Sequence, residues 1–384
     1  MFIYEYYQEY SLYARVTKIG KINYTMKIGL YDPYLDDAGG GEKYMLTIAE
    51  CLSNEHDVTV FWDNAEDLKA VAKRFSLDLS RIKLGENIFS ASFNTLRRAW
   101  KTRKYDAIII LSDGSIPLSL SKKLFVHIQQ PLPRAVKFSW KDTTKLSRIT
   151  RLFYNSVYTM SSNEGKFPGV ASMVLYPPVS LVSKHLKKEN IILHVGRFRV
   201  NNTKGEGDYK KQAIMVDAFK EMADKKQISD WKLIIASSVQ EKDMTAFDLL
   251  RKSAKGYPIE FLVNQTNDAL WEIYGKAKIY WHASGFGEDL EKHPEYAEHF
   301  GISTVEAMGA GAVPVVINSG GQKEIVTDGK NGLLWNTLLD LQQKTKLLMD
   351  DEPLWTSMSK EALIRSKDFS KEKFCEEVNT LVSP

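Results

Sequence analysis

The chain has 384 residues, of which 43% are hydrophobic and 26% charged, and its formal net charge is +4 at pH 7. This length suffices for two domains that each bury a core, and the composition is that of a soluble globular protein. No run approaches the roughly 20 apolar residues of a membrane-spanning helix.

The chain opens on a tyrosine-rich stretch, residues 1–25, which lacks the apolar core of a secretory signal and is predicted to be an extension. From Met26, an apolar run, a glycine-rich loop and a helical pattern follow one another, as at the start of a Rossmann-like domain. Further apolar runs alternate with polar helical windows and begin at Val58, Ala107 and Leu124. This alternation predicts a parallel α/β sheet in residues 26–180.

Pro177 and Pro178 interrupt the pattern and place a domain boundary near residue 180. A second alternating series predicts another doubly wound domain in residues 181–366, and residues 367–384 have the pattern of an amphipathic helix. The expected fold class is therefore α/β, with two Rossmann-like domains. Ligands of such sheets bind at the carboxyl ends of the strands, so candidate site residues are sought there.

The cysteines and the histidine-containing insert predict no metal or thiol chemistry. Cys51 and Cys375 are far apart in sequence and lack metal-ligand spacing, which is typical of a chain in a reducing compartment. His293 and His299 lie in an insert without HExxH spacing, which disfavours zinc.

The stretch Glu298–Val326 has the most distinctive chemistry. It reads as a loop, a helix, a strand and a glycine turn, with Glu306 expected in the first helical turn. Unpaired amides at a helix N-terminus can hold a diphosphate, and the glutamates can accept hydrogen bonds from vicinal sugar hydroxyls. A simpler interpretation remains open for each residue alone, since a glutamate early in a helix, such as Glu306 or Glu324, also complements the helix dipole.

As a unit, the two glutamates eight residues apart, the apolar run at 311–316 and the turn at 319–321 resemble the signature of retaining glycosyltransferase family 4. The resemblance covers nearly all of residues 26–384 and is closest to the oligosaccharide-building mannosyltransferases. It implies the GT-B fold, in which two Rossmann-like domains face each other across a cleft and the C-terminal helix returns to the first domain. It further implies metal-independent, retaining transfer of a hexose from a UDP- or GDP-linked sugar to a glycan or lipid-linked glycan.

The same resemblance implies roles for particular residues. The residues expected to take part in catalysis are His127, Arg197, Lys210 and Glu298. The residues expected to bind the donor are Gly40, Gly41, Lys211, Val263, Asn264, Phe300, Gly301, Ile302, Ser303 and Glu306. In this scheme Arg197 and Lys210 neutralise the diphosphate, Glu306 holds the ribose and Glu298 the sugar.

Three of these assignments keep alternatives. Lys211 is adjacent to Lys210 and could take its place, while the glycines at 39–41 could form only a tight strand-to-helix turn. His127 ends a predicted buried strand, where most histidines are core residues, whereas the resemblance places it against the donor sugar.

The first half of the chain holds the basic excess, because residues 1–179 contain 24 basic and 18 acidic residues. Residues 134–153 interleave basic and large apolar side chains, and residues 97–100 are similar. A solvated helix face is the simpler interpretation, while a surface helix that contacts anionic lipid fits the same pattern. Nucleic acid is disfavoured, since no nucleic-acid-binding module accompanies the charge. We expect a cytoplasmic protein, peripheral on the cytoplasmic face of a membrane.

Two other classes of function remain open at this point. One is a different GT-B enzyme, such as a sugar phosphorylase or a nucleotide-sugar epimerase. The other is a nucleotide-sugar-binding protein without turnover.

Overall fold

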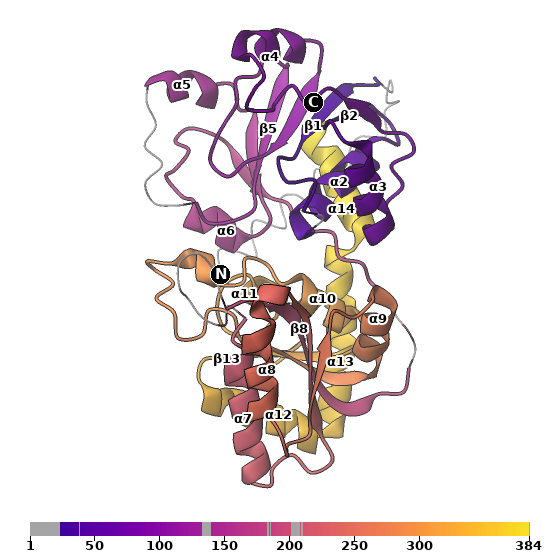
Figure 1. Ribbon diagram of the computed structural model, residues 1–384, viewed down its shortest axis with the longest axis vertical. Coiled ribbons are helices and arrows are strands. Elements are labelled where there is room, and N and C mark those ends of the chain that lie inside the picture. The colour runs from indigo at the N-terminus through magenta and orange to yellow at the C-terminus, as the bar shows by residue number, and fades with distance from the viewer. Residues whose placement is uncertain are drawn as a thin grey trace.

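Two α/β domains are stacked along the long axis of the molecule (Figure 1). The computed structural model describes residues 24–37, 39–132, 140–182, 184, 186–200, 208 and 210–383. The predicted extension at residues 1–25 therefore lies almost wholly outside the described residues.

The N-terminal domain contains a parallel sheet with the strand order β3-β2-β1-β4-β5-β6-β7. Its strands are β1 (Lys27–Tyr31), β2 (Asp57–Phe61), β3 (Lys83–Gly85), β4 (Ala107–Leu111), β5 (Lys123–Ile128), β6 (Arg151–Tyr154) and β7 (Ser172–Val174). Its helices are α2 (Gly40–Leu52), α3 (Ala65–Phe75), α4 (Thr95–Thr102), α5 (Trp140–Leu146) and α6 (Val157–Ser162). All five residues of β4 are buried, as expected for a strand covered on both faces.

The C-terminal domain contains a second parallel sheet, with the order β10-β9-β8-β11-β12-β13. Its strands are β8 (Glu189–Phe198), β9 (Lys232–Val239), β10 (Ile259–Val263), β11 (Ala277–His282), β12 (Val313–Ile317) and β13 (Leu333–Trp335). Its helices are α7 (Gln212–Asp224), α8 (Met244–Ser253), α9 (Asn267–Lys276), α10 (Ile302–Gly309), α11 (Gln322–Ile325), α12 (Leu338–Asp350) and α13 (Glu352–Ser366). Short 3₁₀ helices cover Glu241–Asp243, Pro294–Tyr296 and Lys367–Phe369.

In both sheets the first strand of the domain lies inside the sheet and the chain winds outward in both directions. β1 lies between β2 and β4, and β8 lies between β9 and β11. This topology confirms the predicted α/β class with two Rossmann-like doubly wound domains.

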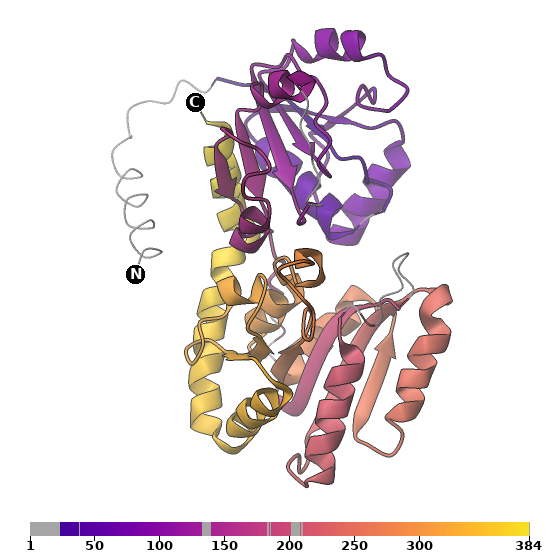
Figure 2. The same cartoon turned by 90° about the vertical axis from the view of Figure 1, so that its left-hand side faces the viewer.

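The last helix, α14 (Lys371–Val382), crosses back from the C-terminal domain and packs against the N-terminal domain (Figure 2). Phe374, Val378 and Leu381, which share the apolar face of this helix, are buried in the core beside α2. The ring of Phe374 meets the edge of the Tyr44 ring with the centroids 5.1 Å apart. The chain therefore passes between the domains twice.

The return of α14 also joins the two cysteines. Cys51 of α2 and Cys375 of α14 form a disulfide, with their Cα atoms 5.2 Å apart across a sequence separation of 324 residues. The expectation that the cysteines have no chemical role is therefore wrong. Sequence spacing could not reveal the pair, because it depends on two helices from opposite ends of the chain.

The basic stretch at 134–153 falls partly on residues 133–139, which lie outside the described residues. In the described remainder, Leu146 and Ile149 are buried in the core of the N-terminal domain rather than presented on its surface. No helix within the described residues has the length and apolar character needed to cross a bilayer.

Candidate active site

The N-termini of two helices, one from each domain, meet between the two sheets. Gly40 is the first residue of α2 and Ile302 the first of α10, and a Cβ atom added to Gly40 would lie 3.8 Å from Cδ1 of Ile302. Lys43 in α2 donates to Ser180 Oγ at 3.1 Å, close to the predicted domain boundary. The meeting of two partial positive charges favours an anion at this place.

Glycines fix the loop that precedes α10. Gly301 has a φ of +124°, and a Cβ atom added there would lie 2.5 Å from Nε2 of Gln322. A Cβ atom added to Gly320 would lie 2.4 Å from the carbonyl oxygen of Glu298, and the Gly321 amide donates to that oxygen at 2.8 Å. The turn at 319–321 thus packs against the glutamate loop, which explains why the motif needs both parts.

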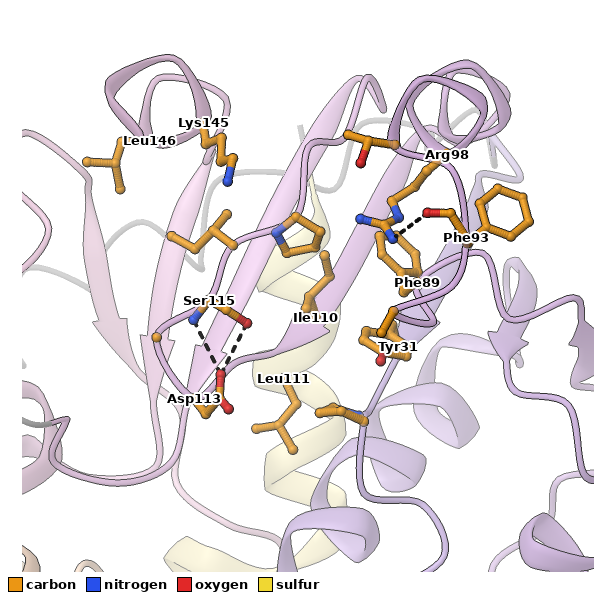
Figure 3. Close-up of a pocket in the computed structure, with 16 residues that line it drawn as sticks. Tyr31, Phe89, Phe93, Arg98, Ile110, Leu111, Asp113, Ser115, Lys145 and Leu146 are labelled. Atoms are coloured by element: carbon orange, nitrogen blue, oxygen red, sulfur yellow. Dashed lines mark hydrogen bonds between the residues drawn. The ribbon is translucent and has the colours of Figure 1, made fainter. Parts of the chain in front are cut away.

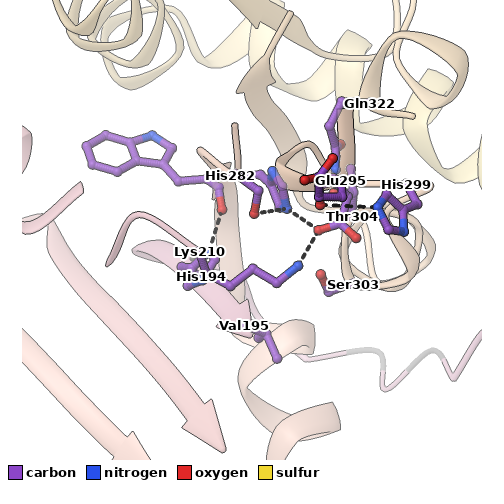
Figure 4. Close-up of polar contacts among 12 residues, drawn as sticks. His194, Val195, Lys210, His282, Glu295, His299, Ser303, Thr304 and Gln322 are labelled. Atoms are coloured by element: carbon purple, nitrogen blue, oxygen red, sulfur yellow. Dashed lines mark hydrogen bonds and ion pairs between the residues drawn. The ribbon is translucent and has the colours of Figure 1, made fainter. Parts of the chain in front are cut away.

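Glu298 is held by a lysine and a histidine (Figure 4). Its Oε2 atom accepts from Lys210 Nζ at 2.5 Å and from His282 Nε2 at 2.8 Å. Burial raises the pKa of Glu298, but the Lys210 charge and the hydrogen bond from His282 outweigh burial and hold this pKa well below its usual range. Glu298 is therefore a carboxylate, and the two predicted catalytic residues Lys210 and Glu298 form an ion pair.

Two histidines beneath this pair were not found by sequence reasoning. His282 is the last residue of β11, and burial lowers its pKa, so that a neutral ring donates to Glu298. His194 of β8 lies beside it with the ring centroids 6.2 Å apart, and burial lowers the pKa of His194 to about 3. A Cβ atom on Gly196 would lie 2.9 Å from Nε2 of His194, so the glycine leaves room for the imidazole ring. The only available sequence signal was the position of both histidines near the carboxyl ends of apolar runs.

The other basic residues predicted to bind the diphosphate, Arg197 and Lys211, lie near the Lys210–Glu298 ion pair. Arg197, at the end of β8, is exposed and makes no ion pair or hydrogen bond with a described residue, and its charge reaches Glu42 in α2 of the other domain. Lys211 precedes α7 with a φ of +57° and pairs with Glu288. Among the described residues, Arg197 thus has only the long-range attraction of Glu42, whereas Lys211 forms an ion pair.

Glu306 stands in the second turn of α10, because the helix begins at Ile302, so the expected first-turn position is wrong. Its Oε2 atom accepts from the Tyr274 hydroxyl at 3.0 Å. Burial raises the pKa of Glu306, while the charge of Lys43 from the N-terminal domain opposes the rise. The neighbouring Ser303 Oγ accepts from the Tyr280 hydroxyl at 2.7 Å.

Val263 is the last residue of β10 and Asn264 follows it; both are predicted to bind the donor, at its nucleotide base. Asn264 has a φ of +51°, and its side chain exchanges hydrogen bonds of 2.9 and 3.1 Å with the main chain of Val239. The side chain of Asn264 therefore joins two strands, which leaves main-chain groups as the atoms available to a base.

His127 and Phe300, which the sequence placed at the site, are buried. The His127 ring stacks between Tyr44 and Phe153, at centroid distances of 4.3 and 4.8 Å, and burial lowers its pKa to about 3. Its Nδ1 contacts the Phe153 carbonyl at 3.1 Å, and its Nε2 has no hydrogen-bond partner. The ring lies in the core of the domain, and its contact with a donor sugar stays a prediction.

Gln129, two residues after His127, reaches the helix junction. A Cβ atom added to Gly41 would lie 2.5 Å from its Oε1. A Cβ atom at Gly41 would thus meet the end of the Gln129 side chain, and Gln129 is a further polar side chain near the site.

Glu324 of α11 joins the two domains at the other side of the junction. Its two carboxylate oxygens accept the amides of Val157 and Tyr158 at 2.7 Å each, at the start of α6. The Tyr158 hydroxyl donates to the Pro294 carbonyl at 2.8 Å. Glu324, which resembles part of the family's turn motif and also suits its own helix dipole, thus forms a contact between the domains.

The N-terminal domain also contains a pocket of about 590 Å³ (Figure 3). It is lined by Tyr31, Pro33, Phe89, Ala91, Phe93, Thr95, Arg98, Ile110, Leu111, Asp113, Gly114, Ser115, Ile116, Pro117, Lys145 and Leu146. Arg98 and Lys145 lie near α4 and α5, whereas Asp113 lies at the carboxyl end of β4. The pocket combines aromatic rings, both signs of charge and a size suited to a small ligand.

No group of three or more His, Cys, Asp or Glu side chains in the described part of the chain is arranged to hold a metal ion. His299 of the insert instead lies 3.3 Å from the Glu295 carbonyl through its Nε2.

Comparison with known proteins identifies the C-terminal half. Residues 181–364 match the family model described as glycosyl transferases group 1. The C-terminal domain is a glycosyl transferases group 1 domain. The chain is 26% identical over 441 residues to a Dictyostelium discoideum GDP-Man:Man(3)GlcNAc(2)-PP-Dol alpha-1,2-mannosyltransferase, over 94% of this chain and 85% of the relative.

A second relative and two solved structures extend this similarity. A Campylobacter jejuni undecaprenol-linked alpha-1,4-N-acetyl-D-galactosaminyltransferase is 22% identical over 90% of this chain and 96% of its own. Anabaena HepE in complex with UDP and glucose has a TM-score of 0.64 at 18% identity, covering 93% of this chain and 99% of HepE. A Rickettsia africae glycosyltransferase has a TM-score of 0.70 at 14% identity, covering 93% of this chain and 98% of its own. These two structures show the GT-B fold for this chain.

Proposed function

We propose that this glycosyltransferase moves a hexose, with retention, from a UDP- or GDP-linked sugar to a glycan or lipid-linked glycan, and that it needs no metal or other cofactor. The observation that carries the proposal is the meeting of two helix N-termini beside Arg197 and Lys210. These groups offer the positive potential that a diphosphate requires when the glycosidic bond breaks.

The donor diphosphate binds at the amides that begin α10, from Gly301 to Ser303, opposite Gly40 and Gly41. Arg197 supplies a charge that forms no ion pair with a described carboxylate. Lys210, already paired with Glu298, supplies a second charge next to the sugar.

The two glutamates hold different parts of the donor, as their hydrogen bonds suggest. One oxygen of Glu306 is occupied by Tyr274, which leaves the other to accept from the ribose hydroxyls. Lys210 and His282 both occupy Oε2 of Glu298, which leaves Oε1 to accept from hydroxyls of the hexose.

In the reaction, the bond between the anomeric carbon and the β-phosphate oxygen breaks, and its electron pair stays on the diphosphate. The acceptor hydroxyl oxygen bonds to the anomeric carbon from the face that the diphosphate leaves. Its proton passes to the leaving phosphate oxygen. Arg197 and the helix amides stabilise the negative charge that develops there.

The acceptor belongs to the N-terminal domain, where the pocket beneath α4 and α5 lies. Two relatives are named for acceptors linked to dolichol and undecaprenol, which supports a lipid-linked glycan. We propose that the reaction takes place at the cytoplasmic face of a membrane, where the Cys51–Cys375 disulfide would be exceptional because that compartment is reducing.

The proposal is tested by thermal shift with UDP, GDP and a panel of their sugars, followed by donor hydrolysis without acceptor. We expect one nucleotide to raise the melting temperature, and Glu306→Ala to abolish that rise while Tyr274→Phe reduces it. A chain that binds no nucleotide, or one that releases sugar phosphate without consuming a nucleotide sugar, would contradict the proposal.

A further inference from the structure

The outer face of α4 exposes two large apolar side chains. Leu96 is 78% exposed and Trp100 is 70% exposed, more than any other large hydrophobic side chain in the described residues. They are four residues apart on the same helix and therefore lie on one face. Leaving a leucine and a tryptophan together in water loses the free energy that their burial would supply.

Positive charge surrounds this pair. Residues 95–104 contain five basic and no acidic residues. Arg97 lies over the Phe93 ring at 5.6 Å, and Lys101 pairs with Glu86. Arg103 and Lys104, just after the helix, are exposed. An apolar pair ringed by cations fits a bilayer surface that contains anionic lipid, because such a surface accepts both.

The inner side of α4 holds the helix firmly in place. The Asn94 side chain caps it by accepting the amides of Leu96 and Arg97 at 3.0 Å each. Arg98 donates to the carbonyls of Ile88, Ser90 and Phe93 at 2.8, 3.1 and 3.3 Å. The outward position of Leu96 and Trp100 is therefore fixed by the fold rather than by a loose end.

The position of α4 suits a membrane contact that leaves the active site open. The helix lies at the end of the N-terminal domain away from the C-terminal domain (Figure 1). Thr95 and Arg98 of the same helix line the pocket, which continues to Asp113 at the carboxyl end of β4 (Figure 3). A lipid-linked acceptor held at this surface would thus have the pocket between its membrane anchor and the donor.

We propose that the outer face of α4, formed by Leu96 and Trp100 within the basic residues Arg97, Lys101, Arg103 and Lys104, docks on an anionic membrane surface. This inference rests on the proposed lipid-linked acceptor and names the partner that would deliver it. The contact is peripheral, with the two apolar side chains at the level of the lipid headgroups and the basic side chains at the anionic phosphates.

The test is flotation of the full chain with vesicles of phosphatidylcholine alone or with a fifth of phosphatidylserine, at low and at physiological salt. Leu96→Ala with Trp100→Ala should reduce binding at least about tenfold, and Arg97→Glu with Lys104→Glu should abolish it, since each basic residue contributes roughly fivefold. The matched controls lie in the C-terminal domain. They are Leu249→Ala with Ile364→Ala, whose side chains are 62% and 60% exposed, and the exposed pair Lys252→Glu with Lys255→Glu.

A second measurement separates docking from catalysis. Nucleotide-induced thermal shift and donor hydrolysis should be the same in the α4 variants and the unaltered chain, because α4 lies outside the donor site. Nucleotide binding without flotation of the unaltered chain would overturn the docking and leave the proposed function standing. Flotation without any nucleotide binding would overturn the proposed function instead. Equal vesicle binding by the α4 variants and the controls, or binding to RNA in place of vesicles, would also overturn the docking.

Discussion

The two domains contribute different kinds of groups to the site between them. In the C-terminal domain, charged side chains hold one another, as Lys210 and His282 hold Glu298. The N-terminal domain contributes a helix N-terminus, a buried neutral histidine and an open pocket. A network of paired charges suits a substrate group whose charge is constant, such as a diphosphate. A large pocket suits a substrate group whose shape varies, such as a glycan. The comparison supports the proposal that the donor binds to the C-terminal domain and the acceptor to the N-terminal domain.

The largest expected effect lies at the exposed cation of the C-terminal domain. Arg197→Ala should lower kcat about 10²- to 10³-fold, because it removes a charge that acts most strongly on the diphosphate in the transition state. The melting temperature should change little, since Arg197 has no partner among the described residues. The check is steady-state transfer kinetics, with the exposed Arg251→Ala as control. An unchanged kcat for Arg197→Ala would remove the arginine from the mechanism.

A second prediction concerns the rigid loop of the C-terminal domain. Gly320 and Gly329 both have positive φ, +58° and +75°, but only Gly320 faces an obstacle, with Glu298 O 2.4 Å from an added Cβ atom. Gly320→Ala should lower the free energy of unfolding by roughly 3 kcal/mol and Gly329→Ala by about 1 kcal/mol. Urea unfolding measures both. Equal losses would show that packing against the glutamate loop is unimportant.

The third prediction uses the buried histidine of the N-terminal domain. Burial depresses the folded-state pKa of His127 to about 3, so between that value and the unfolded pKa of 6.5 only the unfolded chain binds the proton. Stability therefore falls as pH falls below about 6.5, by about 2 kcal/mol at pH 5. His127→Asn should lose less stability than the unaltered chain between pH 7 and pH 5 in urea unfolding. The same loss in both chains would contradict the buried, neutral state.

The His127→Asn variant also tests the contact between His127 and the donor sugar that the sequence predicted. If His127 touches the donor sugar, His127→Asn lowers kcat/KM at pH 7, where the folded histidine and its replacement are both neutral. If the ring is only a core residue, kcat/KM follows the fraction of folded protein.

The sequence predicted the fold because the fold rests on local patterns, while the roles of the donor-site residues stay predictions. Alternating apolar runs specify parallel strands, and the glutamates near 298–306 share a continuous stretch with the glycine turn that supports them. His282, the disulfide and the pocket could not be predicted. Each depends on segments that are distant in sequence, such as β11 beside the loop of Glu298 or α14 beside α2.

The contact of Glu324 also could not be predicted from the sequence, and it gives the prediction with the smallest expected effect. The sequence indicated part of the family's turn motif or a dipole effect, but the carboxylate accepts two amides of α6 in the other domain. In Glu324→Gln one oxygen becomes an amide donor that faces an N–H group, which should weaken the contact by about 1–2 kcal/mol. KM for transfer should then rise about fivefold or more, because the acceptor and the donor meet only when the domains are together. Affinity for the free nucleotide should stay the same, since most of the proposed nucleotide contacts belong to the C-terminal domain, and the half-buried Glu361→Gln should change neither quantity. A parallel loss of nucleotide affinity would mean that Glu324 supports the donor site directly. Donor binding and acceptor binding would then not be confined to separate domains.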